Sequence, residues 1–573
     1  MNNGVWLNYG NYAPEAKENF VASATDISSF SNLDNLNDYQ YKFYNYCSPC
    51  EEYNTLLDGN ALIIPNQDTV NVAFWSEQIS DENGNFANPI VLTLTAEQNY
   101  SSPGLVLTFD KNNNVWATSI NVKWYNGTSL LSNQDYTPNS AIYEINNDVE
   151  LYNKIVITFN KINAPKTRLR FTSIDYGSGA IISKENIQSI SITQEINPLS
   201  VELIENTANV TLQFFENENY LFQRKQPISI YFNDRLLQII FIKSISKKGQ
   251  HIVSLKGEDY LGLMTDIDYK GGIFKNKNAA SLIGEIFDTA NVPYEIDTNL
   301  SNKTVTGYIP YATCRDALQQ VAFAIGAVVD TSDSDKVRIF ELDTTSSKTI
   351  ESIRVMQGQS IDEDDKITRI EMTAHKYVSN GLEDEEIDLY DASEDGEGTG
   401  IFVVFSEPIH DLIISSGIIS EYGDNYAIIS ARDSSCKLRG HKYVHTTFTR
   451  GIDNPNVTAS DPEKVATISD ATLISKSNID NVLEACMNYY KINTSLNSDI
   501  IEKMHVLKNS VYGQNLYGTV KYGMGVNINW DSPINLGDIL NVSNFNNTLY
   551  TGTLIRQSFN ISRYAILKET VVK

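Results

Sequence analysis

The chain has 573 residues, 41% of them hydrophobic and 20% charged, a composition typical of globular proteins that excludes extensive disorder. The 44 basic and 71 acidic residues give a formal net charge of −27 at pH 7, which repels phosphate backbones and anionic membrane surfaces and excludes tight nucleic-acid binding. Abundant tyrosine and short alternating runs of valine, isoleucine and threonine predict a mainly β fold of about three or four domains.

Residues 1–60 contain many asparagines and tyrosines but only weak strand signals. We therefore predict an N-terminal arm that packs on an adjacent chain. This segment lacks the basic and apolar regions of a signal peptide, and no stretch has the roughly 18 uninterrupted apolar residues of a membrane-spanning helix. We expect synthesis in a bacterial cytoplasm and no transmembrane segment.

Residues 61–177 alternate β-runs with turn clusters, as in VAFWSEQIS, DENGN and PIVLTLTAE. About eight strands at this spacing predict a β-sandwich. The runs SSPGLVLTFDK, SINVKWYNG and KIVITFNKINAPKTRLRFTSIDYG resemble discoidin-like, galactose-binding jelly-roll modules. The resemblance implies a sugar site among the loops at one end, with Trp75, Tyr100 and Arg168 as candidate carbohydrate-binding residues, although the strands also need aromatic residues for their core.

Residues 178–265 carry five short strand patterns separated by tight turns such as Asn233-Asp234 and Lys248-Gly249. This spacing predicts a small first β-barrel. Residues Asp259 to Met264 are predicted to form a turn that reverses the chain between this barrel and the next domain.

Residues 266–345 predict an α/β insert with two helices. Ala279 to Ala290 places its apolar residues on one helical face. Thr313 to Ile325 repeats the pattern, with Thr313 as N-cap. Gly326 is predicted to end this helix, and a strand is predicted over Ala327 to Asp330.

Residues 346–573 are predicted to form a second small β-barrel with a helical insertion at Asn478 to Tyr490. The acidic run from Glu383 to Glu397 is predicted to be a solvated loop.

Several segments resemble the tail hub proteins of phages and related bacterial injection machines. These are LKGEDYLGLM, YKGGIF and GYIPYATCRDALQQVAFAIGA between residues 255 and 327, and GDILNV followed by YTGTLIRQSFNIS near the C-terminus. The resemblance implies a structural baseplate hub in a virion tail, a homotrimer whose barrels form a pseudo-sixfold ring. Its implied partners are the tail tube protein, a spike or fibre, other baseplate proteins and a host cell-wall glycan. The expected fold class is thus mainly β with a small α/β insert: a jelly-roll-like β-sandwich plus two small hub-type β-barrels.

Two other functions stay open at this point. A carbohydrate-binding cell-surface adhesin would use residues 61–177 and keep the rest as a scaffold. A peptidoglycan hydrolase component would need a pair of carboxylates whose separation only a structure gives. The chain has no Gly-x-Ser-x-Gly, His-Glu-x-x-His or phosphate-binding Gly-rich motif, so we predict that it is not an enzyme and needs no cofactor.

The five cysteines do not form a disulfide framework, and reduced thiols are expected. Cys47 and Cys50 form a single Cys-x-x-Cys pair, which is half of a structural zinc site. Cys436, His441 and His445 have a permissible ligand spacing, but ordinary strand or turn roles are the expectation. The loop that begins at Asp110 lacks the glycine and glutamate of an EF-hand and predicts a hairpin turn. No metal site is predicted.

Overall fold

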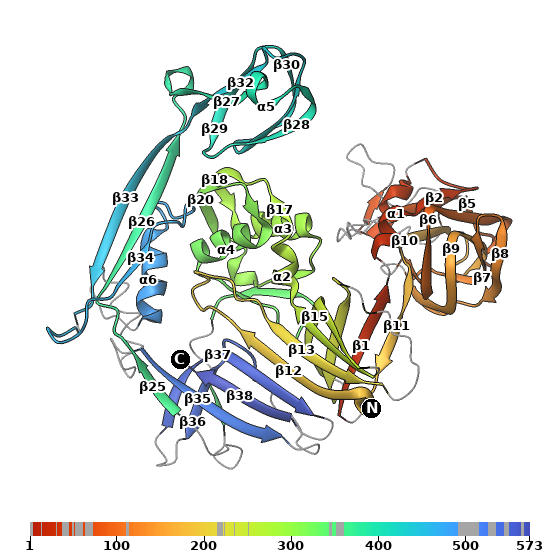
Figure 1. The fold of residues 1–573 in the computed structure, drawn as a ribbon, viewed down its shortest axis with the longest axis horizontal. Coiled ribbons are helices and arrows are strands. Elements are labelled where there is room, and N and C mark those ends of the chain that lie inside the picture. Colours follow the sequence, from red (N-terminus) through yellow and green to blue (C-terminus); the bar gives the residue numbers. More distant parts are fainter. Residues whose placement is uncertain are drawn as a thin grey trace. The chain divides into compact units, whose positions relative to one another are not determined.

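The computed structural model describes residues 4–12, 14–29, 31–36, 45–47, 51, 61–63, 73–110, 114–214, 222, 224–233, 235–249, 251–342, 347–350, 360–455, 457–490, 515–524, 534–543, 549–562 and 566–572. The chain forms two compact units (Figure 1). One consists of Leu7–Ile182 and Glu216–Ile228, and the other of Met1–Trp6, Ser183–Phe215 and Ser229–Lys573. The predicted mainly β fold with a small α/β insert is confirmed. No helix in the described part of the chain is long and apolar enough to cross a membrane.

The first unit contains a 7-stranded sheet in the order β5-β10-β6-β9-β7-β8, with β2 paired to β6. Its strands are β2 (Val21–Ala24), β5 (Phe74–Ile79), β6 (Asn85–Phe109), β7 (Ala117–Asn126), β8 (Ser129–Tyr136), β9 (Ile142–Ile162) and β10 (Arg168–Asp175). The register of β6 against β9 shifts between Thr95 and Gly104, which divides both long strands into two halves. Leu92 and Leu107, from opposite halves of β6, lie in one core, so the sheet folds over as a sandwich.

The described N-terminal segment lies partly in this sandwich. It comprises α1 (Pro14–Asn19), η1 (Leu33–Leu36) and β1 (Val5–Tyr12), which pairs with β11 (Gly177–Ile182); β3 (Asn45–Cys47) and β4 (Ala61–Ile63) pair with each other. Ala16, Phe20 and Leu36 are buried in the sandwich core, and Phe20 stacks on Tyr176 with 4.6 Å between ring centroids. The described residues bury these apolar side chains against their own chain, and the packing of residues 1–60 on an adjacent chain stays a prediction.

The second unit is built on the larger of the sheets. Its strands run in the order β14 (Pro227–Phe232), β15 (Arg235–Lys248), β16 (Ile252–Glu258), β13 (Thr207–Gln213), β12 (Ile187–Glu195), β37 (Leu549–Ser562), β38 (Ile566–Val572), β35 (Asn515–Met524) and β25 (Ser360–Asp364). β36 (Ile539–Ser543) pairs with β37 and with β24 (Ser347–Ile350), and η2 (Lys184–Asn186) leads into β12. The strand sets predicted for the two barrels are thus joined edge to edge where β12 pairs with β37.

The insert follows α2 (Tyr260–Met264), which is capped by Asp259 as the turn predicted there requires. It contains β17 (Asp268–Tyr269), β18 (Gly272–Asn278), α3 (Ala279–Ala290), β19 (Tyr294–Ile296), η3 (Thr298–Leu300), β20 (Thr304–Ile309), β21 (Ala312–Thr313), α4 (Cys314–Ile325), β22 (Val328–Asp330) and β23 (Val337–Phe340). Both predicted helices are confirmed: Thr313 accepts a hydrogen bond from the Asp316 amide at 3.1 Å, and Gly326 ends α4 with φ +68°.

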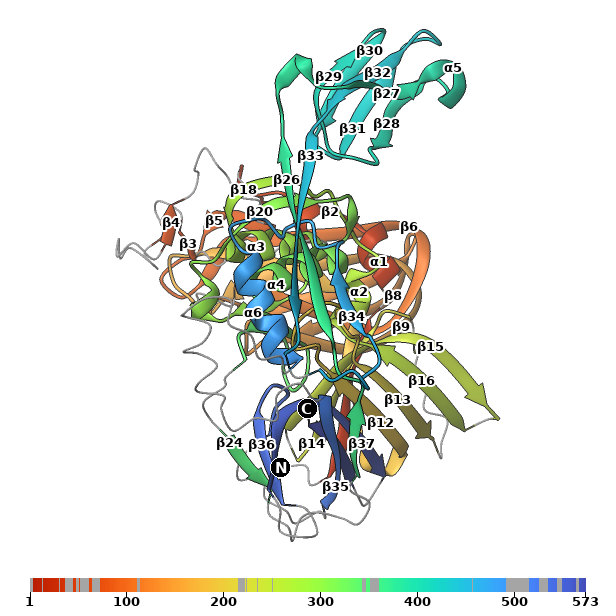
Figure 2. The same cartoon turned by 90° about the vertical axis from the view of Figure 1, so that its left-hand side faces the viewer.

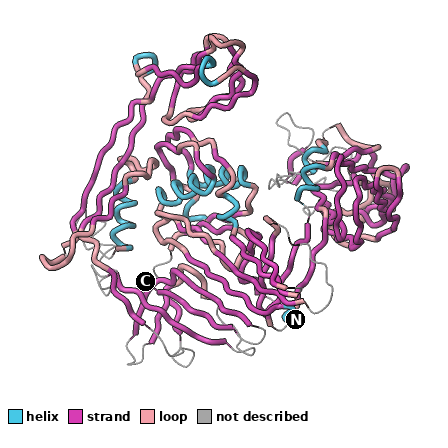
Figure 3. The backbone as a smooth tube through the Cα atoms, in the orientation of Figure 1, coloured by secondary structure: helices cyan, strands magenta, loops and turns pink. Residues whose placement is uncertain are grey.

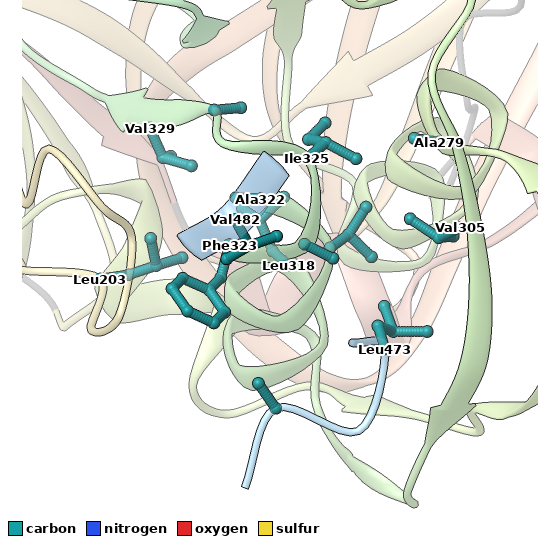
Figure 4. Close-up of a cluster of buried hydrophobic side chains, with 14 of the residues drawn as sticks. Leu203, Ala279, Val305, Leu318, Ala322, Phe323, Ile325, Val329, Leu473 and Val482 are labelled. Carbon is teal, nitrogen blue, oxygen red and sulfur yellow. The ribbon is translucent and has the colours of Figure 1, made fainter. Parts of the chain in front are cut away.

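The core of this unit surrounds α4. Figure 4 shows Leu318, Ala322 and Ile325 of this helix among apolar side chains that include Leu473 and Val482. Val482 belongs to α6 (Ile479–Tyr489), the helix predicted at residues 478–490. Figure 3 shows that the longer helices of this unit, α3, α4 and α6, lie in this region, whereas strands make up most of the rest.

A two-stranded ribbon, β26 (Arg369–Val378) and β33 (Val444–Asp453), carries a small module at its end (Figures 1 and 2). We call residues 379–443 the tip module. It contains η5 (Gly381–Glu383), β27 (Glu386–Asp391), α5 (Ala392–Asp395), β28 (Gly398–Val404), β29 (Ile409–Ile414), β30 (Gly417–Tyr422), β31 (Tyr426–Ala431) and β32 (Lys437–Lys442). Its two 3-stranded sheets, β27-β32-β29 and β28-β31-β30, enclose a core of their own, and β34 (Val465–Ile468) pairs with the ribbon.

The acidic run was predicted to be a solvated loop, and this prediction is wrong for most of its length. Glu386–Asp391 is strand β27 and Ala392–Asp395 is the short helix α5. Asp391 caps α5 and forms a salt bridge with Lys437 at 2.5 Å. The acidic side chains therefore face solvent from regular elements whose alternate residues reach the module core.

A buried polar cluster lies where β12, β15 and β37 meet. Gln194 donates to the Gln238 side-chain oxygen at 2.8 Å and accepts from Gln557 at 2.5 Å, and all three side chains are fully buried. The neighbouring strand β38 adds Lys568, which is 0% exposed, with its ammonium 5.1 Å from the Phe559 ring centroid. Because unpaired amides are costly in such a place, the cluster fixes the register of the join.

Lys568 should make the stability of the protein depend on pH. Burial lowers the pKa of Lys568 to about 7 from the ordinary 10.5. Between these values the unfolded chain binds more protons than the folded chain, so the free energy of unfolding rises as the pH rises through this window. We predict that Lys568→Met removes this rise and adds about 1–4 kcal/mol at neutral pH.

Urea unfolding at a series of pH values measures this effect, with exposed Lys256→Met as the control. A variant that keeps the wild-type pH slope, or that loses stability at neutral pH, would show that Lys568 is not a destabilising buried charge.

Candidate functional site

The three residues predicted to bind carbohydrate lie in the sandwich, but two of them are buried. Trp75 is 5% exposed and Arg168 is 9% exposed. Arg168 donates to the Ser76 carbonyl oxygen at 2.7 Å and to the carbonyl of Glu77. Tyr100 is half-buried and lies 5.5 Å from the Phe20 ring in the core. A sugar needs an exposed ring face and accessible polar groups, which the buried Trp75 and Arg168 do not offer in this structure; carbohydrate binding at these positions stays a prediction.

Trp75 is covered by Arg170, a residue that sequence reasoning missed. The Arg170 guanidinium carbon lies 4.0 Å from the Trp75 ring centroid, and the side chain is 1% exposed. Arg170 forms salt bridges with Glu51 at 2.5 Å and with Asp110 at 2.9 Å. Its two carboxylate partners lie far away in the sequence, so no local pattern indicated the network.

Arg170→Met should destabilise the sandwich strongly. The substitution leaves Glu51 and Asp110 in buried positions without the guanidinium, and removing one partner of a buried pair typically costs about 3–5 kcal/mol. Calorimetry of the full chain should show a lower melting temperature for one transition, whereas Lys123→Met on the outer face of β7 should leave both transitions in place. An unchanged thermogram for Arg170→Met would mean that the network does not support the sandwich.

The candidate metal and thiol residues do not form a site in the described part of the chain. Cys436 is fully buried in the tip-module core, whereas His441 Nδ1 donates to the Asp384 carbonyl oxygen at 2.8 Å and His445 contacts His375. No group of three or more metal-binding side chains occurs among the described residues. Cys47 is the last residue of β3, and Cys50 lies outside the described residues. The loop after Asp110 closes by a Val115 amide to Asp110 carbonyl bond at 3.1 Å, as a hairpin turn requires.

The strongest constellation of buried polar groups joins the tip module to the insert. Asn425, in the turn between β30 and β31, is 0% exposed. Its side-chain amide nitrogen donates to the carbonyl oxygens of Lys270 at 2.8 Å and Ile309 at 2.9 Å. The neighbouring Asp424 carboxylate accepts from the Ile273 amide at 2.8 Å. We call these contacts the Asn425 latch.

Gly271 leaves the space that the latch needs. Its φ is +60°, and a Cβ there would collide with the carbonyl oxygens of Ile309 and Pro310 and lie 2.7 Å from the Asn425 amide nitrogen. A side chain would therefore push the strand ends apart. The YKGG segment has this composition because the backbone passes directly over a buried amide.

The GYIPY segment meets the latch from the other side. Gly307 approaches the backbone of Thr472 and Leu473 so closely that no Cβ fits. Tyr308 is buried and packs against Tyr377 of the ribbon at 5.2 Å, while Tyr311 packs against Phe402 of the tip module at 5.6 Å. One short segment thus contacts the ribbon, the tip module and the helical core.

Two histidines on the ribbon continue this junction. His375 Nε2 lies 2.9 Å from the Ser469 carbonyl oxygen, which only accepts, so this nitrogen carries the proton. His375 Nδ1 then accepts from His445 Nε2 at 3.0 Å, and His445 stacks on Tyr377. Burial lowers the pKa of His375, which favours this neutral arrangement.

At the neck of the tip module, Ser379, His410 and Asp384 lie in a row that superficially resembles a catalytic triad. His410 Nε2 is 3.0 Å from Asp384, but its Nδ1 is 2.9 Å from Asp411 and 3.4 Å from Ser379. The hydrogen bond from the Asn380 amide is the largest of the contacts that lower the pKa of Asp384. Because Asp411 lies closer than Ser379 to the same nitrogen of His410, the row is a hydrogen-bonded neck rather than a nucleophile with its base.

Asn425→Ala should release the tip module without unfolding it. The substitution leaves two buried carbonyl oxygens without donors, at about 1–3 kcal/mol each, while the module keeps its own core. We expect faster hydrogen–deuterium exchange in residues 268–273 and 307–313 and unchanged protection in β31. Asn209→Ala, at an exposed strand position, is the control; equal exchange in both variants would contradict the latch.

The chain is similar to several solved structures, all at low sequence identity. Its sequence matches no protein-family model and no curated protein. It is similar to the tail protein from Neisseria meningitidis MC58, with 11% identity and a TM-score of 0.40 over 68% of this chain and 92% of that one. A 43 kDa tail protein of prophage MuSo2 from Shewanella oneidensis matches with 9% identity and a TM-score of 0.40 over 69% and 95%.

A smaller part of the chain matches the family 32 carbohydrate-binding module from C. perfringens NanJ, in complex with galactose. The identity is 13% and the TM-score 0.19, over 30% of this chain and 98% of that one. The solved structures named here are tail proteins and a carbohydrate-binding module. Identities of this size carry no residue roles from one chain to the other.

Proposed function

We propose that this chain is the structural hub of a phage tail or tail-like particle, a homotrimer that joins a sixfold tail tube to a threefold spike or fibre. The observation that carries the proposal is that the YKGG and GYIPY segments contact three parts of the unit at once. Their backbones and rings hold the tip module, the ribbon and the helical core together at the Asn425 latch. The junction is therefore built to fix elements in place.

The continuous sheet supports the same function. The join of β12 and β37 makes one platform from strands more than 300 residues apart, and buried glutamines fix its register. β25 ends the described sheet with an open edge of the sequence SIDED. Open edges persist in soluble proteins when they are charged or covered, and a neighbouring subunit of a ring would cover this one.

The polar groups of the described residues favour a structural role over an enzymatic one. Buried carboxylates such as Asp259, Asp330 and Asp384 are engaged by capping amides, hydroxyls or histidine. None of them faces a nucleophile that is free to react in the described part of the chain. In a tail the net charge of −27 would let DNA pass without adhering. The site of action is then the virion tail, with the tube protein, the spike or fibre and other baseplate proteins as partners.

The oligomeric mass tests the hub proposal. Light scattering of the full-length protein over a concentration series, with negative-stain images of the same samples, should give a trimer with a central opening. The control is the same series at high salt, because a ring held by apolar and backbone contacts should persist. A dimer, or a monomer at every concentration, would contradict the trimeric hub.

A host cell-wall glycan is the second candidate partner, and the open face of the sandwich favours it. Asn121, Lys123 and Tyr125 of β7 point away from the core and alternate with buried residues. The Asn121 amide donates to Asn133 at 2.9 Å and to Asp135 at 2.8 Å, and Lys154 lies 5.5 Å from the Tyr125 ring centroid. A partly exposed ring beside prearranged amide, carboxylate and ammonium groups suits a ligand with one apolar face and many hydroxyls.

Purified cell-wall glycans test this second function. Tyr125→Ala should weaken binding by about tenfold or more, which is about 1.4 kcal/mol or more, because the ring supplies the apolar contact. Tyr422→Ala removes a 68% exposed tyrosine outside the sandwich and serves as the control. Wild-type protein that binds no glycan, or equal loss in both variants, would remove glycan binding and leave the hub proposal intact.

A further inference from the structure

The outer face of one tip-module sheet is apolar and open. Phe402 and Val404 of β28 are 42% and 47% exposed, and Ile418 of β30 is 51% exposed. Phe402 pairs with Ile428 and Val404 with Tyr426, so these side chains share one face with Ile418. The opposite face supplies the module core through Val403, Ala427 and Ile429. The module thus keeps apolar side chains on both faces of a small sheet, and its own core accounts for only one.

The strand that carries this face is also an edge. β28 pairs only with β31 among the described strands, and its seven residues leave one row of backbone groups unpaired. The bulge between Gly398 and Ile401 disturbs the first part of the strand and leaves Phe402 to Val404 regular. Long apolar edges are usually blunted in soluble proteins, because they accept a further strand. An uncovered edge beside an apolar face is the geometry of strand addition.

The charge of the module defines what can approach this edge. Residues 379–443 contain 14 acidic and 4 basic residues, a net charge of −10. The lysines and one arginine are engaged within the module, in the pairs Lys437–Asp391, Arg439–Asp388 and Lys442–Glu407. Exposed acidic residues flank β28 at both ends, with Glu394, Asp395 and Glu397 before it and Glu407 after it.

The Asn425 latch fixes the orientation of this face. It holds the turn between β30 and β31, at the end of the sheet where Val404 pairs with Tyr426. Tyr311 covers one side of Phe402, and Lys270 pairs with Glu421 at 2.5 Å on the same rim. The insert therefore closes one end of the face and leaves the β28 edge open, so that a partner would meet a preorganised surface.

We propose that β28 and the apolar face of Phe402, Val404 and Ile418 bind an extended segment of a partner protein as an added strand. The partner segment has apolar side chains at alternate positions, which continue the apolar face, and lysine or arginine at both ends, opposite the acidic residues that flank β28. A second copy of this chain is disfavoured, because two modules of charge −10 repel each other at close range. This interaction is independent of the hub proposal, since it needs only the folded chain.

A synthetic peptide tests the proposal on the purified full-length protein. The probe is fluorescein-labelled Lys-Lys-Val-Thr-Val-Thr-Val-Lys-Lys, whose valines fall on one face of an extended strand. One control peptide replaces the lysines by glutamate, and another replaces the valines by serine. Fluorescence anisotropy should show saturable binding of the probe and at least about tenfold weaker binding of both controls.

Matched variants locate the binding site. Phe402→Thr combined with Val404→Thr should weaken probe binding by about tenfold or more, and Glu394→Gln combined with Glu397→Gln should weaken it by a smaller factor that shrinks as salt is added. Val201→Thr, at a 42% exposed position outside the module, is the control. Circular dichroism and the melting temperature show whether each variant is folded. If the Phe402→Thr, Val404→Thr variant does not fold, the Glu394→Gln, Glu397→Gln variant still tests the proposal.

Three results would overturn the proposal. Equal binding of the serine peptide and the probe would show attraction by net charge alone. Unchanged probe binding by both the apolar and the charge variants would place the site elsewhere. Concentration-dependent self-association that excludes the probe and disappears in the Phe402→Thr, Val404→Thr variant would make a second copy of this chain the occupant.

Discussion

The second unit depends on one buried amide. Asn425 donates both hydrogens of its side-chain nitrogen to carbonyl oxygens of two chain segments that are about 40 residues apart, Lys270 and Ile309. Ile309 is the last residue of β20 and Lys270 lies between β17 and β18, so the asparagine supplies donors to two backbone carbonyls beside the ends of strands. Its burial requires the absence of a Cβ at Gly271, which explains the first glycine of the YKGG segment.

Buried side-chain hydrogen bonds also connect other elements of this unit that are far apart in the sequence. Gln194, Gln238 and Gln557 connect the two strand sets through buried side-chain bonds. Asp259 caps α2 and also accepts from Thr331 and the Asn206 backbone. Buried polar groups contribute little net stability, but they penalise every alternative register. The polar interior therefore specifies how the elements meet, which is what a structural component requires.

The elements that were predicted correctly have local causes. The helices at residues 279–290 and 313–325 follow from apolar periodicity and from caps within three residues of their ends. The sandwich strands follow from alternation and turn residues. An alternating strand accommodates Trp75 and Arg168 equally well when they are buried or exposed. The neighbouring Arg170 has its partners Glu51 and Asp110 about 120 and 60 residues away in the sequence.

The junction could not be predicted for the same reason. Asn425 sits in the short turn GDN, which looks like any polar hairpin, and only tertiary structure brings it against Gly271 and Ile309. The tip module was missed because dense acidic residues between 383 and 397 resemble a solvated loop, although Ile387, Leu389 and the strands after them alternate toward a core. The alternation of apolar residues indicates strands there, but the many acidic residues between them are equally typical of a solvated loop.

The location of the protein in particles tests the central claim of a tail hub most directly. Immunogold electron microscopy, with an antibody against the tip module, can be applied to tails or tail-like particles from cells that make this protein. The hub account predicts gold at one end of the tail and none on the cell surface. Gold on the cell surface with unlabelled particles would contradict it and favour a cell-surface adhesin.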